Sequence, residues 1–274
     1  RLPPKKYEWN VVRVLSGIAL GAPTLLVVWS APPVLFLWLV VVVALCAAWE
    51  FQGLIAHCGW AGVRWEGTLD VGLLILSFWA GGLTPGVALT FIILRILVRS
   101  MNTSDRKVGL AGAGVSVLGL LWVGGAGSLV VLIRLVDSGR EAIVFLFAVV
   151  WANDIAAYYV GRAVGIRKLA PSISPGKTVE GALGGLVAGA VVGLALAGWL
   201  EIAGMGRGWA LAAALILGGL SQVGDLCESF VKRAAEKKDS GTGIPGHGGV
   251  LDRIDGLLLA APPFYYFLRW IAAG

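Results

Sequence analysis

Three aspartates near the end of the 274-residue chain have the spacing of a metal site. Asp252 and Asp255 stand three residues apart at the head of one apolar segment, and Asp225 lies at the end of the preceding one. In proteins Mg²⁺ takes one or two carboxylates and keeps waters and substrate phosphates as its other ligands. The pattern favours Asp225, Asp252 and Asp255 as metal ligands; the alternative is a solvated acidic loop.

Basic side chains surround these aspartates. Ser229 and Lys232 follow Asp225 at intervals of four and three residues, which places the three on one face of a helix. Lysines in a cytosolic loop are usually only solvated, but that alternative does not explain carboxylates at a membrane boundary. We expect the basic residues to surround the ion and a bound polyphosphate with positive charge: Lys232, Arg233, Lys237, Lys238 and Arg253.

Glycines fill the chain between the basic residues and the last aspartates. From residue 240 to residue 249 it reads SGTGIPGHGG. Because glycine has little bulk, backbone amides here can approach phosphate oxygens closely, and we expect Gly248 and Gly249 to bind substrate. For His247, backbone geometry, hydrogen bonding to phosphate and proton transfer all remain open.

A carboxylate also lies within the apolar stretch WANDIAAYYVGRAVG, residues 151–165. Asp154 and Tyr158 share a helical face, and a carboxylate inside an apolar helix is costly unless it faces a partner, an ion or water. A salt bridge to Arg162 is the structural alternative. We favour a functional role for Asp154 because of its position.

A second upstream stretch, APSISPGKTVEGALGG, covers residues 170–185. Ser174 begins a turn, and Lys177, Thr178 and Glu180 precede a helix whose free N–H groups suit an anion. Taken alone, this pattern is that of an ordinary capped helix start with a solvated lysine.

The elements that position these residues are membrane helices. The composition is 58% hydrophobic and 14% charged, with a mean hydropathy of +0.84, which lies outside the range of soluble domains. A membrane-spanning helix needs about 20 apolar residues. We therefore predict an all-α, polytopic transmembrane protein of about nine spans, near residues 11–29, 33–50, 68–83, 86–99, 110–134, 141–163, 181–200, 208–227 and 256–272.

We expect one integral-membrane domain, residues 1–274. Residues 1–109 would be N-terminal anchoring helices, and residues 110–274 would carry the active site. Glycines at every fourth position from Gly181 to Gly193 predict a close helix contact, either internal or between subunits. The three cysteines show no CxxC spacing, so neither a disulfide framework nor a zinc site is expected.

The positions of Lys and Arg predict the orientation. Cytoplasmic loops retain basic residues, and with nine spans most of the 22 fall on one side. We expect the N-terminus and the active-site loops in the cytoplasm and the C-terminus outside. The net charge of +6 then reflects this bias and attraction to anionic membrane lipid, not nucleic-acid binding. The other side receives only Arg134, Arg140, Arg207 and Arg269.

The run from Ser229 to Asp255 closely resembles the signature of phosphatidate cytidylyltransferases, the CDP-diacylglycerol synthases. The two upstream stretches are similar to that family's D-x-x-A-Y-x-x-G and S-P-K-K-T-x-E-G motifs. Gly176 is a departure, since the family commonly has Lys there. The first four expected spans match the family only in being apolar.

The resemblance implies condensation of CTP with phosphatidic acid to CDP-diacylglycerol and pyrophosphate, dependent on Mg²⁺, in a bacterial inner membrane. It also suggests a homodimer and a second cation. Catalytic roles are expected for Asp225, Lys232, His247, Asp252 and Asp255. Substrate-binding roles are expected for Asp154, Tyr158, Ser174, Lys177, Thr178, Glu180, Ser229, Arg233, Lys237, Lys238, Gly248, Gly249 and Arg253.

Two other classes of protein share some of these features. A lipid or isoprenoid-alcohol kinase also places Asp and Lys at a cytoplasmic membrane boundary, but it releases a nucleoside diphosphate. A secondary transporter uses intramembrane carboxylates around a midplane site. Here the charged residues cluster at one membrane face and no matched half-repeats are found, which argues against transport.

Overall fold

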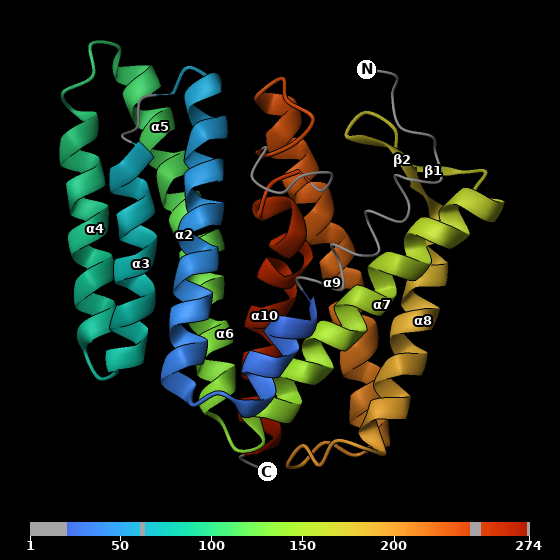
Figure 1. Ribbon diagram of the computed structural model, residues 1–274. Helices are drawn as coiled ribbons and strands as arrows, with labels where there is room; N and C mark the ends of the chain where they lie inside the picture. Colours follow the sequence, from blue (N-terminus) through green and yellow to red (C-terminus); the bar gives the residue numbers. More distant parts are fainter. Residues whose placement is uncertain (1–20, 61–63, 242–247, 273–274) are drawn as a thin grey trace, which may run out of the picture.

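The computed structural model describes residues 21–60, 64–241 and 248–272, and nearly all of them are helical (Figure 1). The prediction of an all-α polytopic membrane protein is confirmed. Five helical segments in this part of the chain are long and apolar enough to cross a membrane: Pro33–His57, Arg106–Leu135, Gly139–Val164, Val179–Ala197 and Arg207–Ala234. The count of about nine spans stays a prediction.

The first half of the chain forms a bundle of antiparallel helices, which occupies one side of the molecule in Figure 1. An apolar helix at Gly21–Ser30 precedes it. The labelled elements are α2 (Pro33–His57), α3 (Arg64–Ala80), α4 (Thr84–Ser100), α5 (Arg106–Gly119), the π-helix η1 (Leu120–Gly125) and α6 (Ala126–Leu135).

The third and fourth predicted spans are two separate helices. Helix α3 ends at Ala80, and Gly81 and Gly82 turn the chain with positive φ angles of 72° and 62°. Helix α4 then begins at Thr84 with Pro85 in its first turn, where the missing N–H of proline costs no hydrogen bond. Thr84 and Pro85 therefore form the first turn of α4.

The second half of the chain carries the predicted chemistry. Its elements are α7 (Gly139–Val164), β1 (Lys168–Ala170), β2 (Ser174–Thr178), α8 (Val179–Ala197), α9 (Arg207–Ala234) and α10 (Leu251–Ile271). Strands β1 and β2 pair antiparallel, with Lys168 opposite Thr178 and Ala170 opposite Ser174. Sequence reasoning predicted only a turn at this place, because two short polar strands show no apolar alternation.

Two apolar cores hold these halves together. One core consists mainly of residues from α2, α3, η1 and α6, and the other of residues from α6, α7, α9 and α10. Helix α10 contributes to both, since Leu251 and Leu258 belong to the first core and Phe264 and Leu268 to the second. In Figure 1, α10 accordingly lies between α2 and α9.

The glycine seam of α8 is an internal contact. Gly181, Gly185 and Gly189 are buried against α7, where an added Cβ at Gly185 would lie 2.7 Å from the carbonyl oxygen of Asn153. At the far end of the seam, Gly193 faces Ala214 of α9. Small residues thus let α7 and α8 approach closely at the end where the predicted site lies.

Candidate active site

Three carboxylates meet where α9 and α10 cross. The ligand-capable atoms of Asp225, Glu228 and Asp255 lie within 4.8 Å of one another, and Glu228 and Asp255 are buried. Glycines permit the crossing, because a Cβ on Gly224 would lie 2.5 Å from the carbonyl oxygen of Asp255. Packing of α9 on α10 therefore brings together acidic groups that are 30 residues apart at most.

Glu228 is the most deeply buried member of this cluster. One of its oxygens, Oε2, pairs with the ammonium group of Lys232. The other, Oε1, is buried and has no hydrogen-bond partner among the described residues. A buried polar atom without a partner is costly. The free oxygen beside two further carboxylates fits a bound cation, so the cluster has the donors that a divalent metal ion needs.

Asp252 belongs to a different network. It accepts hydrogen bonds from Lys232 Nζ at 2.5 Å, from Gly249 N–H at 2.8 Å and from the N–H of Ser240 at 3.1 Å. These contacts hold Ser240 and Gly249 against the first turn of α10. Within the described residues, the structure thus groups Glu228 with Asp225 and Asp255, and Asp252, a predicted metal ligand, lies outside that group.

Lys177 joins the hairpin to the carboxylate cluster. Its ammonium group lies 2.6 Å from Oδ2 of Asp225. Asp154 is exposed on α7 and interacts electrostatically with Asp225, Lys177 and Arg253. The structure therefore brings two of the upstream stretches to the same place as the aspartates of α9 and α10. No ion pair between Asp154 and Arg162 is found among the described residues. Arg162 instead donates a hydrogen bond to the hydroxyl of Tyr158 at 3.1 Å.

A buried amide network fixes α7 against α8 and α9 beside this cluster. Asn153 donates from Nδ2 to the hydroxyl of Ser221 at 3.0 Å, and its Oδ1 accepts from Gln222 at 2.9 Å. Gln222 also donates to the carbonyl of Ala182 on α8. Asp154 follows Asn153 directly and Asp225 lies one helical turn after Gln222, so these contacts hold the two aspartates at a set separation.

The polar residues at the start of α8 mainly shape the backbone. Thr178 caps the helix by accepting from Gly181 N–H at 3.1 Å. Glu180 accepts from the N–H groups of Ile166 and Arg167, both at 3.1 Å, and thereby ties the α7–β1 connection to α8. The substrate-binding roles of Thr178 and Glu180 stay predictions, and the contacts seen are structural.

The predicted basic residues differ in exposure. Lys232 is enclosed between Glu228 and Asp252, whereas Arg233 is exposed and donates to the carbonyls of Ile173 and Lys237. The side chains free to meet an incoming anion are Lys237, Lys238 and Arg253, all exposed.

The remaining predicted residues lie around these groups. Ser174 starts strand β2, and Ser229 is buried on α9. Gly248 has a φ of +76°, which favours glycine, and a Cβ there would lie 2.6 Å from Oδ2 of Asp252. A Cβ on Gly249 would overlap Oε2 of Glu50, so that position also favours glycine. His247 lies outside the described residues.

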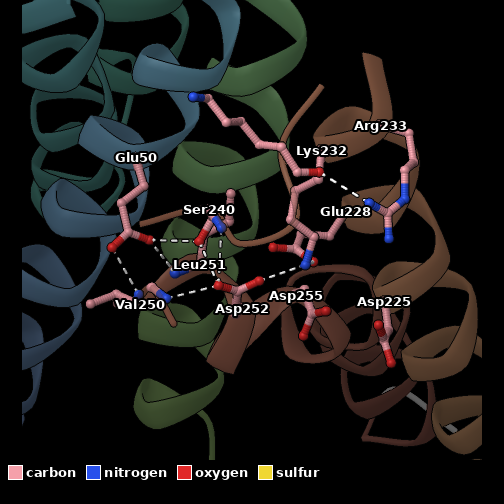
Figure 2. A network of polar contacts seen from close by, with 12 residues as sticks. Glu50, Asp225, Glu228, Lys232, Arg233, Ser240, Val250, Leu251, Asp252 and Asp255 are labelled. Carbon is pink, nitrogen blue, oxygen red and sulfur yellow. Dashed lines mark hydrogen bonds and ion pairs between the residues drawn. The ribbon is translucent and has the colours of Figure 1, made fainter. Parts of the chain in front are cut away.

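Sequence reasoning missed two carboxylates. Glu228 stands three residues after Asp225 and four before Lys232, so the helical spacing that selected those residues also selects it. Glu50 is the second; it is buried near the end of α2 and accepts hydrogen bonds from Val250 and Leu251 (Figure 2). A single carboxylate within an apolar segment was the available signal, and it is the argument already applied to Asp154.

Comparison with known proteins places these features in context. The cytidylyltransferase family matches residues 11–271 of the chain. The phosphatidate cytidylyltransferase of Brucella suis biovar 1 (strain 1330) is 39% identical over 260 residues, which are 93% of this chain and 92% of that protein. The phosphatidate cytidylyltransferase of Bacillus subtilis (strain 168) is 39% identical over 176 residues, 63% and 62% of the two chains. Similarity to the Brucella protein thus covers the anchoring helices as well as the carboxylate cluster.

Proposed function

The chain belongs to the cytidylyltransferase family, and we propose that it condenses CTP with phosphatidic acid to give CDP-diacylglycerol and pyrophosphate. The observation that carries this proposal is the 39% identity, over 93% of the chain, with a protein named for this activity. The carboxylate and lysine cluster at the ends of membrane helices supports it, because that is where a lipid phosphate meets a nucleotide from water.

The reaction demands control of charge. A phosphate oxygen of phosphatidic acid forms a bond to the α-phosphorus of CTP, and the bond from that phosphorus to the β-phosphate oxygen breaks to release pyrophosphate. Both reactants are anionic, so the protein must align them and offset their repulsion. The lipid phosphate is already largely ionised near neutral pH, so the proposal includes no obligatory general base.

We assign the cluster a metal-binding role within this reaction. Asp225, Glu228 and Asp255 would hold Mg²⁺, which supplies charge stabilisation to the phosphates when bound. Lys177 and Lys232 keep the carboxylates in position through their ion pairs. The resemblance to the family also leads us to propose a second cation, without assigning its ligands.

The exposed cations are assigned to the nucleotide. Lys237 and Lys238 follow the end of α9, Arg253 lies in the first turn of α10, and all three are exposed, so we assign them the neutralisation of the polyphosphate. Gly248 and Gly249, which lie against Asp252 and Glu50, are assigned to the approach of backbone amides to the phosphates. Asp154, exposed beside Lys177, is assigned to substrate binding on the α7 side.

The identity of the phosphate product tests the proposal. Purified protein in mixed micelles is incubated with CTP, Mg²⁺ and phosphatidic acid, and the products are separated. We expect pyrophosphate and CDP-diacylglycerol in equal amounts, and neither when phosphatidic acid is omitted. Release of a nucleoside diphosphate would instead identify a kinase and overturn the proposal.

We further propose that the protein lies in a bacterial inner membrane with its N-terminus and site in the cytoplasm. In a background without Cys46, Cys58 and Cys227, single cysteines are placed beside Lys177, beside Lys238 or after Arg269. Only the last should react with a membrane-impermeant thiol reagent added to intact cells. Labelling beside Lys238 would contradict this orientation.

We also propose a single membrane domain that forms a homodimer and binds no nucleic acid. Helix α10 completes both apolar cores, which supports one domain. The dimer rests on the family resemblance. Light scattering of the purified protein, corrected for detergent, should give twice the chain mass of 28.6 kDa. A mass of one chain would reject the dimer.

A further inference from the structure

Glu50 links the anchoring half of the molecule to the loop that enters α10. It lies on α2, yet its partners follow it by 190 to 201 residues. Its Oε1 accepts from Val250 N–H at 3.0 Å, and its Oε2 accepts from Leu251 N–H at 2.8 Å. Figure 2 shows the side chain reaching across from α2 toward these backbone groups.

These contacts supply the N-terminal cap that α10 lacks. Its N-cap residue is Val250, whose side chain makes no capping hydrogen bond. The first N–H groups of a helix have no partner within the helix, and negative charge is favourable there. The carboxylate of Glu50 meets both needs, so the start of α10 is occupied by a group of the protein itself.

The other end of the same loop also contacts Glu50. The hydroxyl of Ser240 lies 3.0 Å from Oε2 of Glu50 and 2.9 Å from Oδ2 of Asp252. A hydroxyl has one proton, so Ser240 donates to one of the two carboxylates at a time. Ser240 also donates its N–H to Asp252, and through Ser240 the two acidic groups hold the loop at both ends.

Glycines fit closely around the Glu50 carboxylate. A Cβ on Gly249 would overlap Oε2 of Glu50 and the Ser240 hydroxyl, and one on Gly241 would lie 2.6 Å from Oε1. Gly241 and Gly249, which we expected to let backbone amides approach phosphate, therefore also make room for the Glu50 carboxylate. Arg64 on α3 interacts electrostatically with Glu50, which offsets the cost of burying its charge.

We propose that Glu50 is a positioning residue for nucleotide use. This inference rests on the proposed function. By holding Ser240, Val250 and Leu251, Glu50 sets where α10 begins, and with it the distance from Asp255 to Asp225 and Glu228. The anchoring half of the chain thereby acts on the nucleotide side of the reaction without touching the substrate, while the lipid side is independent of this contact.

Glu50→Gln is the principal variant. It keeps the size of the side chain but removes the charge and replaces one acceptor oxygen by an N–H donor that faces other donors. Hydrogen bonds to charged groups contribute about 1.5–3 kcal/mol, so kcat/KM for CTP should fall about ten- to hundredfold. The KM for phosphatidic acid should stay unchanged, and the Mg²⁺ concentration for half-maximal activity should rise.

Glu66→Gln is the matched control, since Glu66 is also largely buried in the first half but pairs with Arg95 and Arg99. It should lower thermal stability without changing the ratio of the two KM values. A double-mutant cycle of Ser240→Ala and Glu50→Gln tests whether the two residues act together. If they do, their losses in kcat/KM for CTP should not add. Glu50→Asp keeps the charge and should retain part of the activity.

The outcomes separate this inference from the proposed function. Wild-type protein that makes no CDP-diacylglycerol would overturn the function. Active wild-type protein whose Glu50→Gln variant keeps a normal kcat/KM for CTP, or raises the KM values for CTP and for phosphatidic acid by the same factor, would overturn the positioning role. If Glu50→Gln does not fold, additive effects of Glu50→Asp and Ser240→Ala would overturn it as well.

Discussion

The two halves of the molecule each contain a cluster of buried or partly buried carboxylates, but only one of the two clusters has as many basic as acidic groups. In the first half, Glu66 and Asp70 face Arg95 and Arg99, and Arg95 pairs with both acids. These residues line a cavity of about 350 Å³ with Gln52 and several hydroxyl groups. Two acidic and two basic groups leave no net charge there.

In the second half, acidic groups outnumber their cations. Asp225, Glu228 and Asp255 lie together, and Asp252 shares Lys232 with Glu228. In the part of the chain that the structure describes, these four carboxylates form ion pairs only with Lys177 and Lys232. Ionised carboxylates in a low-dielectric environment are costly without compensating charge. Both clusters are buried or partly buried, so the excess of acid in the second half, not its burial, is what supports our proposal of a cation site there.

The largest expected effect comes from reducing that excess. Asp225→Asn or Glu228→Gln should lower kcat/KM by about a thousandfold, because several kcal/mol of metal-centred stabilisation are lost at about 1.4 kcal/mol per factor of ten. Initial rates over a range of Mg²⁺ concentrations measure this, and high Mg²⁺ should restore part of the rate. Normal turnover of both folded variants at limiting Mg²⁺ would contradict the metal-binding assignment and indicate that the cluster is structural.

Unbalancing the first cluster should affect stability instead. Arg95→Met leaves Glu66 and Asp70 without their shared cation, and breaking a buried pair costs about 3–5 kcal/mol. The thermal unfolding midpoint in detergent should fall by several degrees. The protein that remains folded should keep the wild-type kcat. A selective loss of CTP use would show that the first cluster also serves the reaction, which would contradict its purely structural role.

Substitutions of Lys232 test the role of the partly buried ammonium group that pairs with Glu228 and Asp252. Lys232→Met leaves Glu228 and Asp252 without their shared partner, so kcat/KM for CTP should fall about ten- to hundredfold. Lys232→Arg keeps the charge and should lose less. The KM for phosphatidic acid, measured in the same assays, should not change in either variant.

Lys238 should show the smallest effect. It is exposed, and single exposed charges contribute about 0.2–1 kcal/mol. Lys238→Ala should therefore raise the KM for CTP only about two- to fivefold, and added salt should narrow the difference from wild type. Lys168→Ala on strand β1, also exposed, is the control and should leave this KM unchanged. If Lys238→Ala and Lys168→Ala raised the KM for CTP equally, the assignment of Lys238 to the nucleotide would be wrong.

The sequence predicted the helical class because continuous apolar segments of about 20 residues are typical of membrane-spanning helices. It predicted that Asp225 and Asp255 lie close together, as the structure has them, because helical spacing at a segment boundary is a local signal. Glu50 and Asp252 show the limit of such reasoning: contact across 201 residues depends on how α2 packs on α10, and no local pattern encodes it. For Asp252, spacing could not reveal that Ser240, Gly249 and Lys232 occupy its oxygens.

Helix α10 has a consequence for the order of events during biosynthesis. Among the described helices it leaves the ribosome last, yet Leu251 and Leu258 fill the core of the first half. The helices made earlier can enter the bilayer one by one, but their apolar contacts stay incomplete until this final segment arrives. We therefore expect nascent chains stalled before residue 251 to be much more sensitive to proteases than released chains, in both halves at once.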